Sequence, residues 1–163
     1  MRNVNRLCVI LLVLFLQSGM AFAQKAGAAK YKCLVQMTNY IGEGAYIVVS
    51  LVDAKGAYEK TLSVMGSNKK WYPTLKEWHK FNVKKPANIS AITGASVAGG
   101  DRSVTVLEIE EAKINAGYKL RFETAVEDKK YYQADLEVPL TTGGMAGKTE
   151  GTNYIRYVRL SAN

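Results

Sequence analysis

The amino-acid sequence predicts a mostly β protein, an antiparallel β-sandwich of immunoglobulin-like type with one short inserted helix. About seven or eight short segments alternate apolar with polar residues and are rich in Val, Tyr and Thr, which is typical of half-buried strands. Gly, Asn and Asp separate these segments as turn residues. The segment from Pro73 to Phe81 has helical spacing instead. A small β-barrel would use the same strands and is the alternative.

The N-terminal residues 1–23 have the three parts of a secretory signal peptide. Met1 to Arg6 is a basic start, Leu7 to Leu16 is an unbroken apolar run, and Ala21 to Ala23 is a small-x-small cleavage site. The apolar run is shorter than the roughly 20 residues that a membrane-spanning helix needs. We therefore expect cleavage after residue 23 and a periplasmic or otherwise extracytoplasmic protein with no membrane anchor.

The remaining chain is expected to form one domain. Residues 24–30 are small and basic without any period, so we predict a flexible lead-in there. Residues 31–163 fit a single β-sandwich domain, since they contain no repeat of constant period and no Pro-rich tract. Signal cleavage leaves Cys33 without a second cysteine, and its alternation with Tyr31 and Val35 predicts a buried thiol.

The expected elements follow from local patterns in chain order. Trp71, Leu75 and Trp78 recur at spacings of four and three residues, with Pro73 where the first turn of a helix tolerates it. A glycine-rich stretch is predicted to be a mobile loop around Gly143. The predicted strands, which share period-two alternation, are 31–39, 45–53, 58–65, 103–109, 118–126, 131–140 and 152–161.

Composition limits the classes of function. The formal net charge is +8, but the basic residues are scattered, and an export signal argues against a nucleic-acid target. His79 and Cys33 are too few to supply a metal cluster or a nucleophile with its base, so we predict no metal and no independent turnover. We interpret His79 as a solvated residue of the helix.

The best candidate for a functional site is the loop from Ser90 to Asp101, where small, hydroxyl-bearing and glycine residues gather. Thr93 and Ser96 place hydroxyls on either side of Gly94, whose missing Cβ would let a phosphorylated group approach the backbone. A plain connection between a helix and a strand explains the same composition, because loops are rich in these residues for conformational reasons. Both interpretations stay open.

Four segments of the chain carry a family resemblance, and they read V-S-L-V-D-A-K-G-A-Y-E-K-T-L-S-V-M-G, K-W-Y-P-T-L-K-E-W, I-T-G-A-S and N-A-G-Y-K-L-R-F-E. Their order resembles that of domain-of-unknown-function family 2271, a family of small exported bacterial proteins. T-G-A-S also resembles the acceptor motif on which a separate flavin transferase attaches FMN through a phosphoester. This resemblance implies that Ser96 is the acceptor and that Thr93, Gly94 and Ala95 complete the motif.

The resemblance further implies a periplasmic electron carrier that works with a membrane haem-linked or iron-linked redox protein. Beside such a flavin, we predict that Trp71 or Trp78 covers the ring system and that nearby lysines, Lys85 among them, help to neutralise the phosphate. The alternative is a cofactor-free extracytoplasmic binding or accessory module, whose sheet face or Gly143 loop would contact a partner.

Overall fold

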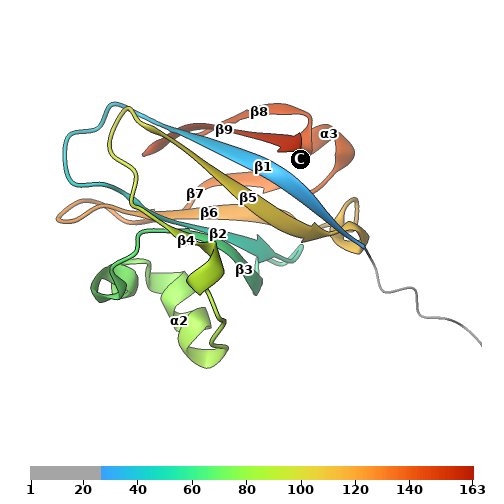
Figure 1. Ribbon diagram of the computed structural model, residues 1–163, viewed down its shortest axis with the longest axis horizontal. Helices are drawn as coiled ribbons and strands as arrows, with labels where there is room; N and C mark the ends of the chain where they lie inside the picture. Colours follow the sequence, from blue (N-terminus) through green and yellow to red (C-terminus); the bar gives the residue numbers. More distant parts are fainter. Residues whose placement is uncertain (1–26) are drawn as a thin grey trace, which may run out of the picture.

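The computed structural model describes residues 27–163, which form two β-sheets packed face to face (Figure 1). One sheet has the strand order β5-β1-β9-β8, and the other has the order β4-β3-β2-β6-β7. Neighbouring strands pair antiparallel, apart from the parallel pair β3–β4. The strands are β1 (Ala28–Met37), β2 (Tyr46–Val52), β3 (Tyr58–Met65), β4 (Thr93–Gly94), β5 (Arg102–Glu110), β6 (Lys119–Ala125), β7 (Tyr132–Pro139), β8 (Gly147–Glu150) and β9 (Ile155–Ala162). The predicted fold class is confirmed.

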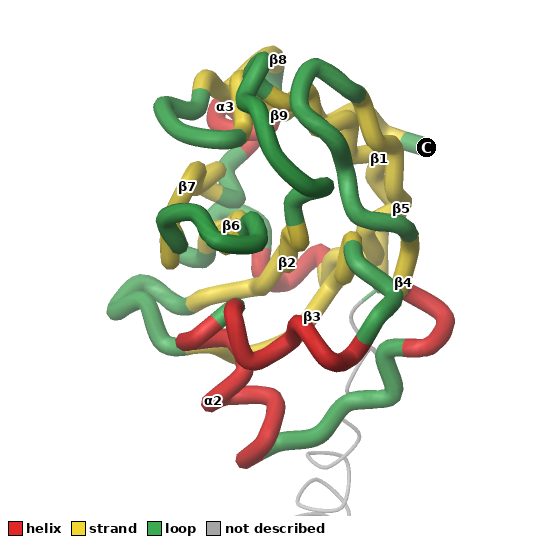
Figure 2. The backbone as a smooth tube through the Cα atoms, turned by 90° about the vertical axis from the view of Figure 1, so that its left-hand side faces the viewer, coloured by secondary structure: helices red, strands yellow, loops and turns green. Residues whose placement is uncertain are grey.

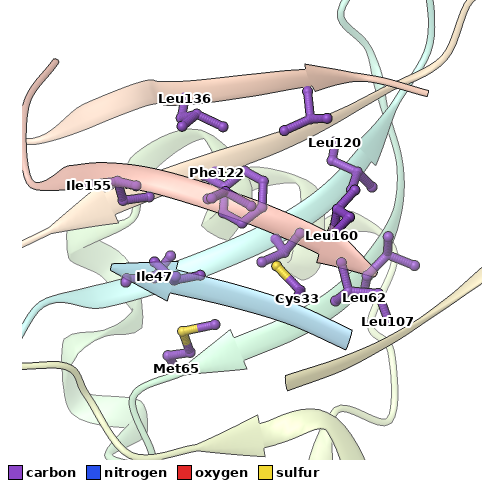
Figure 3. Packing of buried hydrophobic residues seen from close by; sticks show 14 of the residues in the cluster. Cys33, Ile47, Leu62, Met65, Leu107, Leu120, Phe122, Leu136, Ile155 and Leu160 are labelled. Carbon is purple, nitrogen blue, oxygen red and sulfur yellow. The ribbon is translucent and has the colours of Figure 1, made fainter. Parts of the chain in front are cut away.

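The main core lies between the two sheets and is built by the alternation that the sequence predicts. Every second residue of β1 from Cys33 onward is fully or almost fully buried. Figure 3 shows Cys33, Ile47, Phe122 and Ile155 meeting in this layer, from strands of both sheets. Cys33 is therefore a core residue, and burial raises the pKa of its thiol to about 12.

Helices cover the outer face of the five-stranded sheet. The helical region is longer than predicted and is divided into a 3-10 helix, η1 (Lys69–Thr74), and an α-helix, α2 (Lys76–Lys84). Figures 1 and 2 show α2 on the side of β2 and β3 that faces away from β1 and β5. Leu75 and Trp78 are fully buried there, and Trp78 Nε1 donates a hydrogen bond to Thr61 Oγ1 at 2.9 Å. Both faces of β2 are buried in consequence.

A buried carboxylate joins α2 to the sheet. Glu123 on β6 is 0% exposed, and its oxygens accept the backbone N–H of Trp78 at 3.1 Å and the phenol hydroxyls of Tyr58 and Tyr131 at 2.6 and 2.9 Å. The N-cap residue Leu75 has no side-chain acceptor, so Glu123 provides the negative group that a helix N-terminus favours. Burial raises the pKa of Glu123 in spite of these bonds, which lower it.

Two segments are more ordered than their composition predicts. The described part of the lead-in joins the sheet, because β1 begins at Ala28, opposite Glu110 of β5, and not at Tyr31. The glycine-rich stretch forms the short helix α3 (Thr142–Met145), capped by a bond from Gly144 N–H to Thr141 Oγ1, and then the edge strand β8. That stretch is therefore ordered structure and not the loop that was predicted.

The predicted signal peptide, residues 1–23, lies outside the described residues. Among residues 27–163, none of the helices has the length and apolar character needed to cross a membrane.

Candidate functional site

The loop that carries T-G-A-S is fastened at both ends. Its first half forms the 3-10 turn η2 (Ser90–Ile92) and then β4, which pairs with the end of β3 at Val64 and Met65. Its second half is held by an isolated bridge in which Ala45 and Val97 exchange backbone hydrogen bonds of 2.8 and 3.0 Å. Between these two anchors Ala95 and Ser96 are exposed to solvent.

The two hydroxyls of the motif differ in their bonding. Thr93 Oγ1 donates a hydrogen bond to the carbonyl oxygen of Ile89 at 2.8 Å and is partly buried. Ser96 is exposed, and its Oγ has no hydrogen-bond partner among residues 27–163. Of the two motif hydroxyls, that of Ser96 is therefore the exposed and unbonded one, while that of Thr93 stabilises the turn before it.

Two glycines shape the space around the motif. A Cβ at Gly44 would lie 2.7 Å from Ser96 Oγ, which is closer than real Cβ atoms approach. Any residue other than glycine at position 44 would therefore displace the Ser96 side chain. A Cβ at Gly94 would meet no atom of the described chain within 4 Å, so that side of the loop is open. The role of Gly44 depends on a tertiary contact, and the sequence carries no local signal for it.

A tyrosine and a glutamine fix the backbone on which Ser96 is presented. Tyr40 Oη accepts the N–H of Ala45 at 2.8 Å and donates to the carbonyl oxygen of Val97 at 2.7 Å, so it spans both sides of the bridge. Gln36 Nε2 donates to the carbonyl oxygen of Gly100 at 2.8 Å. The end of β1 and the connection between β1 and β2 thus hold the T-G-A-S loop in place.

The structure brings Ser96 and Trp71 to the same hollow. This hollow has a volume of about 150 Å³, and Gly44, Tyr46 and Thr74 also line it. Trp71 lies on η1 and is half-buried, with Lys70 Nζ 4.7 Å from the centre of its ring.

Beyond Trp71 the hollow adjoins a wider groove of about 490 Å³, because Trp71, Thr74, Ala125 and Glu127 line both. The groove contributes a second aromatic ring, that of Tyr131, and the ammonium group of Lys76 lies 5.5 Å from the centre of this ring. The remaining cations of the groove are Lys129 and Lys130.

Charges of both signs surround Ser96. The carboxylate residues Glu43 and Glu127 line its hollow, whereas the lysines of the adjoining groove lie beyond Trp71. An anion near Ser96 would meet repulsion on one side and attraction on the other.

Lys85 does not join this site. It follows α2 and lines a separate hollow with Glu59, Lys60 and Phe81, where its Nζ lies 3.5 Å from the carbonyl oxygen of Glu59. Nearness in the sequence to the T-G-A-S loop predicted a contact that the direction of α2 does not provide.

The lone histidine and the mature cysteine both lie outside the Ser96 hollow. Within residues 27–163 no three side chains of His, Cys, Asp and Glu lie together as a metal site would need. His79 is half-buried on α2 and is not among the residues that line the Ser96 hollow.

By its fold and its loop, this protein is a small β-sandwich that presents an exposed serine hydroxyl next to an aromatic side chain. The chain belongs to the DUF2271 family, described as predicted periplasmic protein, whose model matches residues 28–157. The match begins with the first residue of β1 and ends within β9, so it covers both sheets. Comparison with curated proteins and with solved structures finds no match.

Proposed function

We propose that this protein carries an FMN covalently bound to Ser96 and passes electrons to or from a membrane haem-linked or iron-linked redox protein. The observation that carries the proposal is the placement of Ser96. Its hydroxyl is exposed, unbonded within the described chain and in one hollow with Trp71, while the other motif hydroxyl, that of Thr93, is engaged.

Attachment is a group transfer that a separate flavin transferase would perform. Ser96 Oγ attacks the phosphorus of the FMN half of FAD, the phosphoanhydride bond breaks, and AMP leaves. The Oγ–P phosphoester forms, and the hydroxyl proton passes to solvent or to a base of the transferase. The open side of Gly94 leaves the loop backbone accessible to that enzyme.

The residues around Ser96 fit a flavin. The groove of about 490 Å³ lies within the range of about 300–1,000 Å³ that small-molecule sites occupy. Trp71 and Tyr131 offer aromatic faces for a planar ring system. A bound flavin supplies the one-electron or two-electron chemistry, and the chain supplies attachment, stacking and charge. The groove is lined by Lys76, Lys129 and Lys130 and by Glu127 and Asp128, and these charges would tune the reduction potential of a flavin bound there.

The test is transfer in vitro with purified components. The mature protein is incubated with a flavin transferase, FAD and magnesium ion, then denatured, and protein-bound flavin fluorescence is measured after electrophoresis. We expect a fluorescent band for the wild type and for Thr93→Ala, and no band for Ser96→Ala. A fluorescent Ser96→Ala protein would overturn the acceptor assignment.

Two observations favour a second candidate, a cofactor-free binding or accessory module. Glu43 and Glu127 line the hollow that contains Ser96, and carboxylates repel a phosphate. The chain also has Ser90 and Ser96 where the flavin acceptor motif usually has Asp and Thr. A wild-type protein that stays free of flavin at saturating transferase and FAD would favour this candidate over the electron carrier.

A further inference from the structure

The two sheets end in four edge strands, and three of these are protected against pairing with another chain. Strand β4 has two residues, β8 has four and bears Lys148 and Glu150, and β7 contains Pro139 and a register shift against β6. Short length, charge, proline and irregular register are the features by which edges avoid unwanted pairing.

The fourth edge, β5, is neither short nor irregular and has no proline, and its charged residues, Arg102, Glu108 and Glu110, lie toward its two ends. It is nine residues long, contains no Pro or Gly, and pairs with β1 in an unbroken register. Figure 2 shows it at the margin of the sandwich, with β1 on one side. Val104 and Val106 are 61% and 45% exposed on it. A long, regular, β-branched edge of this kind is a template for another strand.

The free side of β5 is accessible, and the direction of its backbone groups follows from its pairing. The backbone bonds to β1 at the two ends of β5 involve its odd-numbered flanking residues, Asp101 and Glu111. Met37 N–H donates to Asp101 O at 3.0 Å, and Glu111 N–H donates to Gly27 O at 2.9 Å. Backbone groups alternate in direction along an antiparallel strand, so those of Val104 and Val106 point away from β1. A hollow of about 220 Å³ separates residues 103–106 from the end of β3 and from residues 91–94, so no strand of the described chain pairs with this side of β5.

The side chains of β5 indicate which strand pairs with its free edge. From Arg102 to Glu108, the side chains that face away from the core are those of Arg102, Val104, Val106 and Glu108. When this strand lies antiparallel to a second copy of itself, opposite charges meet at the ends and valines meet between them. We propose that β5 pairs antiparallel with β5 of a second copy, with a two-fold axis between the two Thr105 residues. This register places Arg102 opposite Glu108 of the other copy, and Val104 opposite Val106.

The register satisfies the backbone as well as the side chains. The even-numbered residues of β5, whose backbone groups point away from β1, form the hydrogen-bonded pairs with the second copy. The two Thr105 residues face each other without backbone bonds between them. A shift of the axis to Glu108 would set like charges opposite each other, which is unfavourable. The resulting dimer would have one continuous sheet of eight strands, twice the four of β5-β1-β9-β8.

Cross-linking tests the register directly. Opposed residues without backbone bonds between them have Cα atoms about 4.5 Å apart, within the range that a disulfide bridges. Oxidised Thr105→Cys protein should therefore form a covalent dimer. In the matched control, Val106→Cys, the two cysteines are offset along the strands and should stay uncross-linked. Cys33 is fully buried and does not compete.

Charge exchange tests the pairing in solution by sedimentation velocity over a concentration series. Arg102→Glu should raise the dimer dissociation constant by about tenfold or more, because two attractive pairs become repulsive. The exchange variant Arg102→Glu with Glu108→Arg should restore the dimer. Arg156→Glu, an exposed residue of β9 on the same sheet that does not line the hollow of Arg102, is the control and should leave the constant unchanged.

Two outcomes would overturn the proposal. One is a wild-type chain that stays monomeric at every concentration while Thr105→Cys forms no cross-link. The other is a cross-link through Val106→Cys instead of Thr105→Cys, which would require another register. Thermal unfolding of each variant confirms that it is folded, so that loss of the dimer is read as loss of the interface.

Discussion

Gly44 and Ser96 are packed so closely that a single methyl group at position 44 would lie 2.7 Å from Ser96 Oγ and 3.1 Å from its Cβ. The contact lies next to the bridge between Ala45 and Val97, so it forms part of the frame that presents Ser96. It ties the T-G-A-S loop to the connection between β1 and β2, which lies far away in the sequence.

This contact predicts the effect of Gly44→Ala. The added Cβ should displace the Ser96 side chain and slow flavin attachment by about tenfold or more, a change of about 1.4 kcal/mol in the barrier. Folding should be little affected, within about 1 kcal/mol, because Ser96 is exposed and can rotate. The rate is measured from protein-bound flavin at timed points with a fixed amount of transferase.

Gly143→Ala is the matched control, since a Cβ there would meet no described atom within 4 Å. It should be modified at the rate of the wild type. A Gly44→Ala protein that is modified equally fast would show that the close contact does not matter for presentation of Ser96.

Trp71→Ala should change the environment of the flavin without preventing its attachment. Trp71 lines the hollow of Ser96, so its ring is placed to stack on a flavin joined there and to quench its emission. We expect normal incorporation, brighter flavin emission and a shifted midpoint potential. Lys85→Ala is the control, because Lys85 lines a different hollow. Equal changes in both variants would contradict the placement of the ring.

Glu123 gives the stability a pH dependence of defined sign. Burial raises its pKa above the unfolded value, so the folded protein holds the proton more readily than the unfolded chain does. Its contribution to the free energy of unfolding is therefore complete below the unfolded pKa, about 4.3, and falls as the pH rises through the folded pKa. Urea unfolding at several pH values measures this dependence.

Glu123→Gln lacks this titration and should be less stable by about 1–3 kcal/mol even where Glu123 is ionised, because its amide group cannot replace both carboxylate oxygens as an acceptor. The difference in unfolding free energy between wild type and variant should narrow as the pH rises. Glu150→Gln is the control, since the neighbouring Lys148 lowers the pKa of Glu150 and reverses the sign. A difference that widens with rising pH would contradict the account of Glu123.

Cys33 should be unreactive in the native protein. Its thiol is fully buried and its pKa is raised to about 12, so almost no thiolate is present near neutral pH. A disulfide reagent should label it only after denaturant is added, which absorbance measures directly. Stoichiometric labelling of the native protein would show that the core opens readily around β1.

The strands could be predicted from the sequence because alternation is a local property. Cys33 is an example, since its burial follows from its neighbours in β1. Strand β4 could not be predicted in the same way. Its two residues, Thr93 and Gly94, carry no period, and they form a strand because the end of β3 offers them free backbone groups.

The candidate site was predictable in part for the same reason. The T-G-A-S segment is a local signal, and Trp71 stands out as an aromatic residue upstream of it. Gly44, Tyr40 and Glu123 reach their partners only through the tertiary fold, so no spacing in the sequence identifies them. Lys85 is the opposite case. It is close in the sequence to the T-G-A-S loop, but the path of α2 places it at a different hollow.

The central claim, that Ser96 carries FMN, is tested most directly by mass spectrometry of the mature protein co-produced with a flavin transferase. The account predicts an intact mass increased by one FMN less one water, and fragment spectra that locate the increase at Ser96. An unmodified mass under saturating transferase and FAD, or an increase located at Thr93, would contradict it.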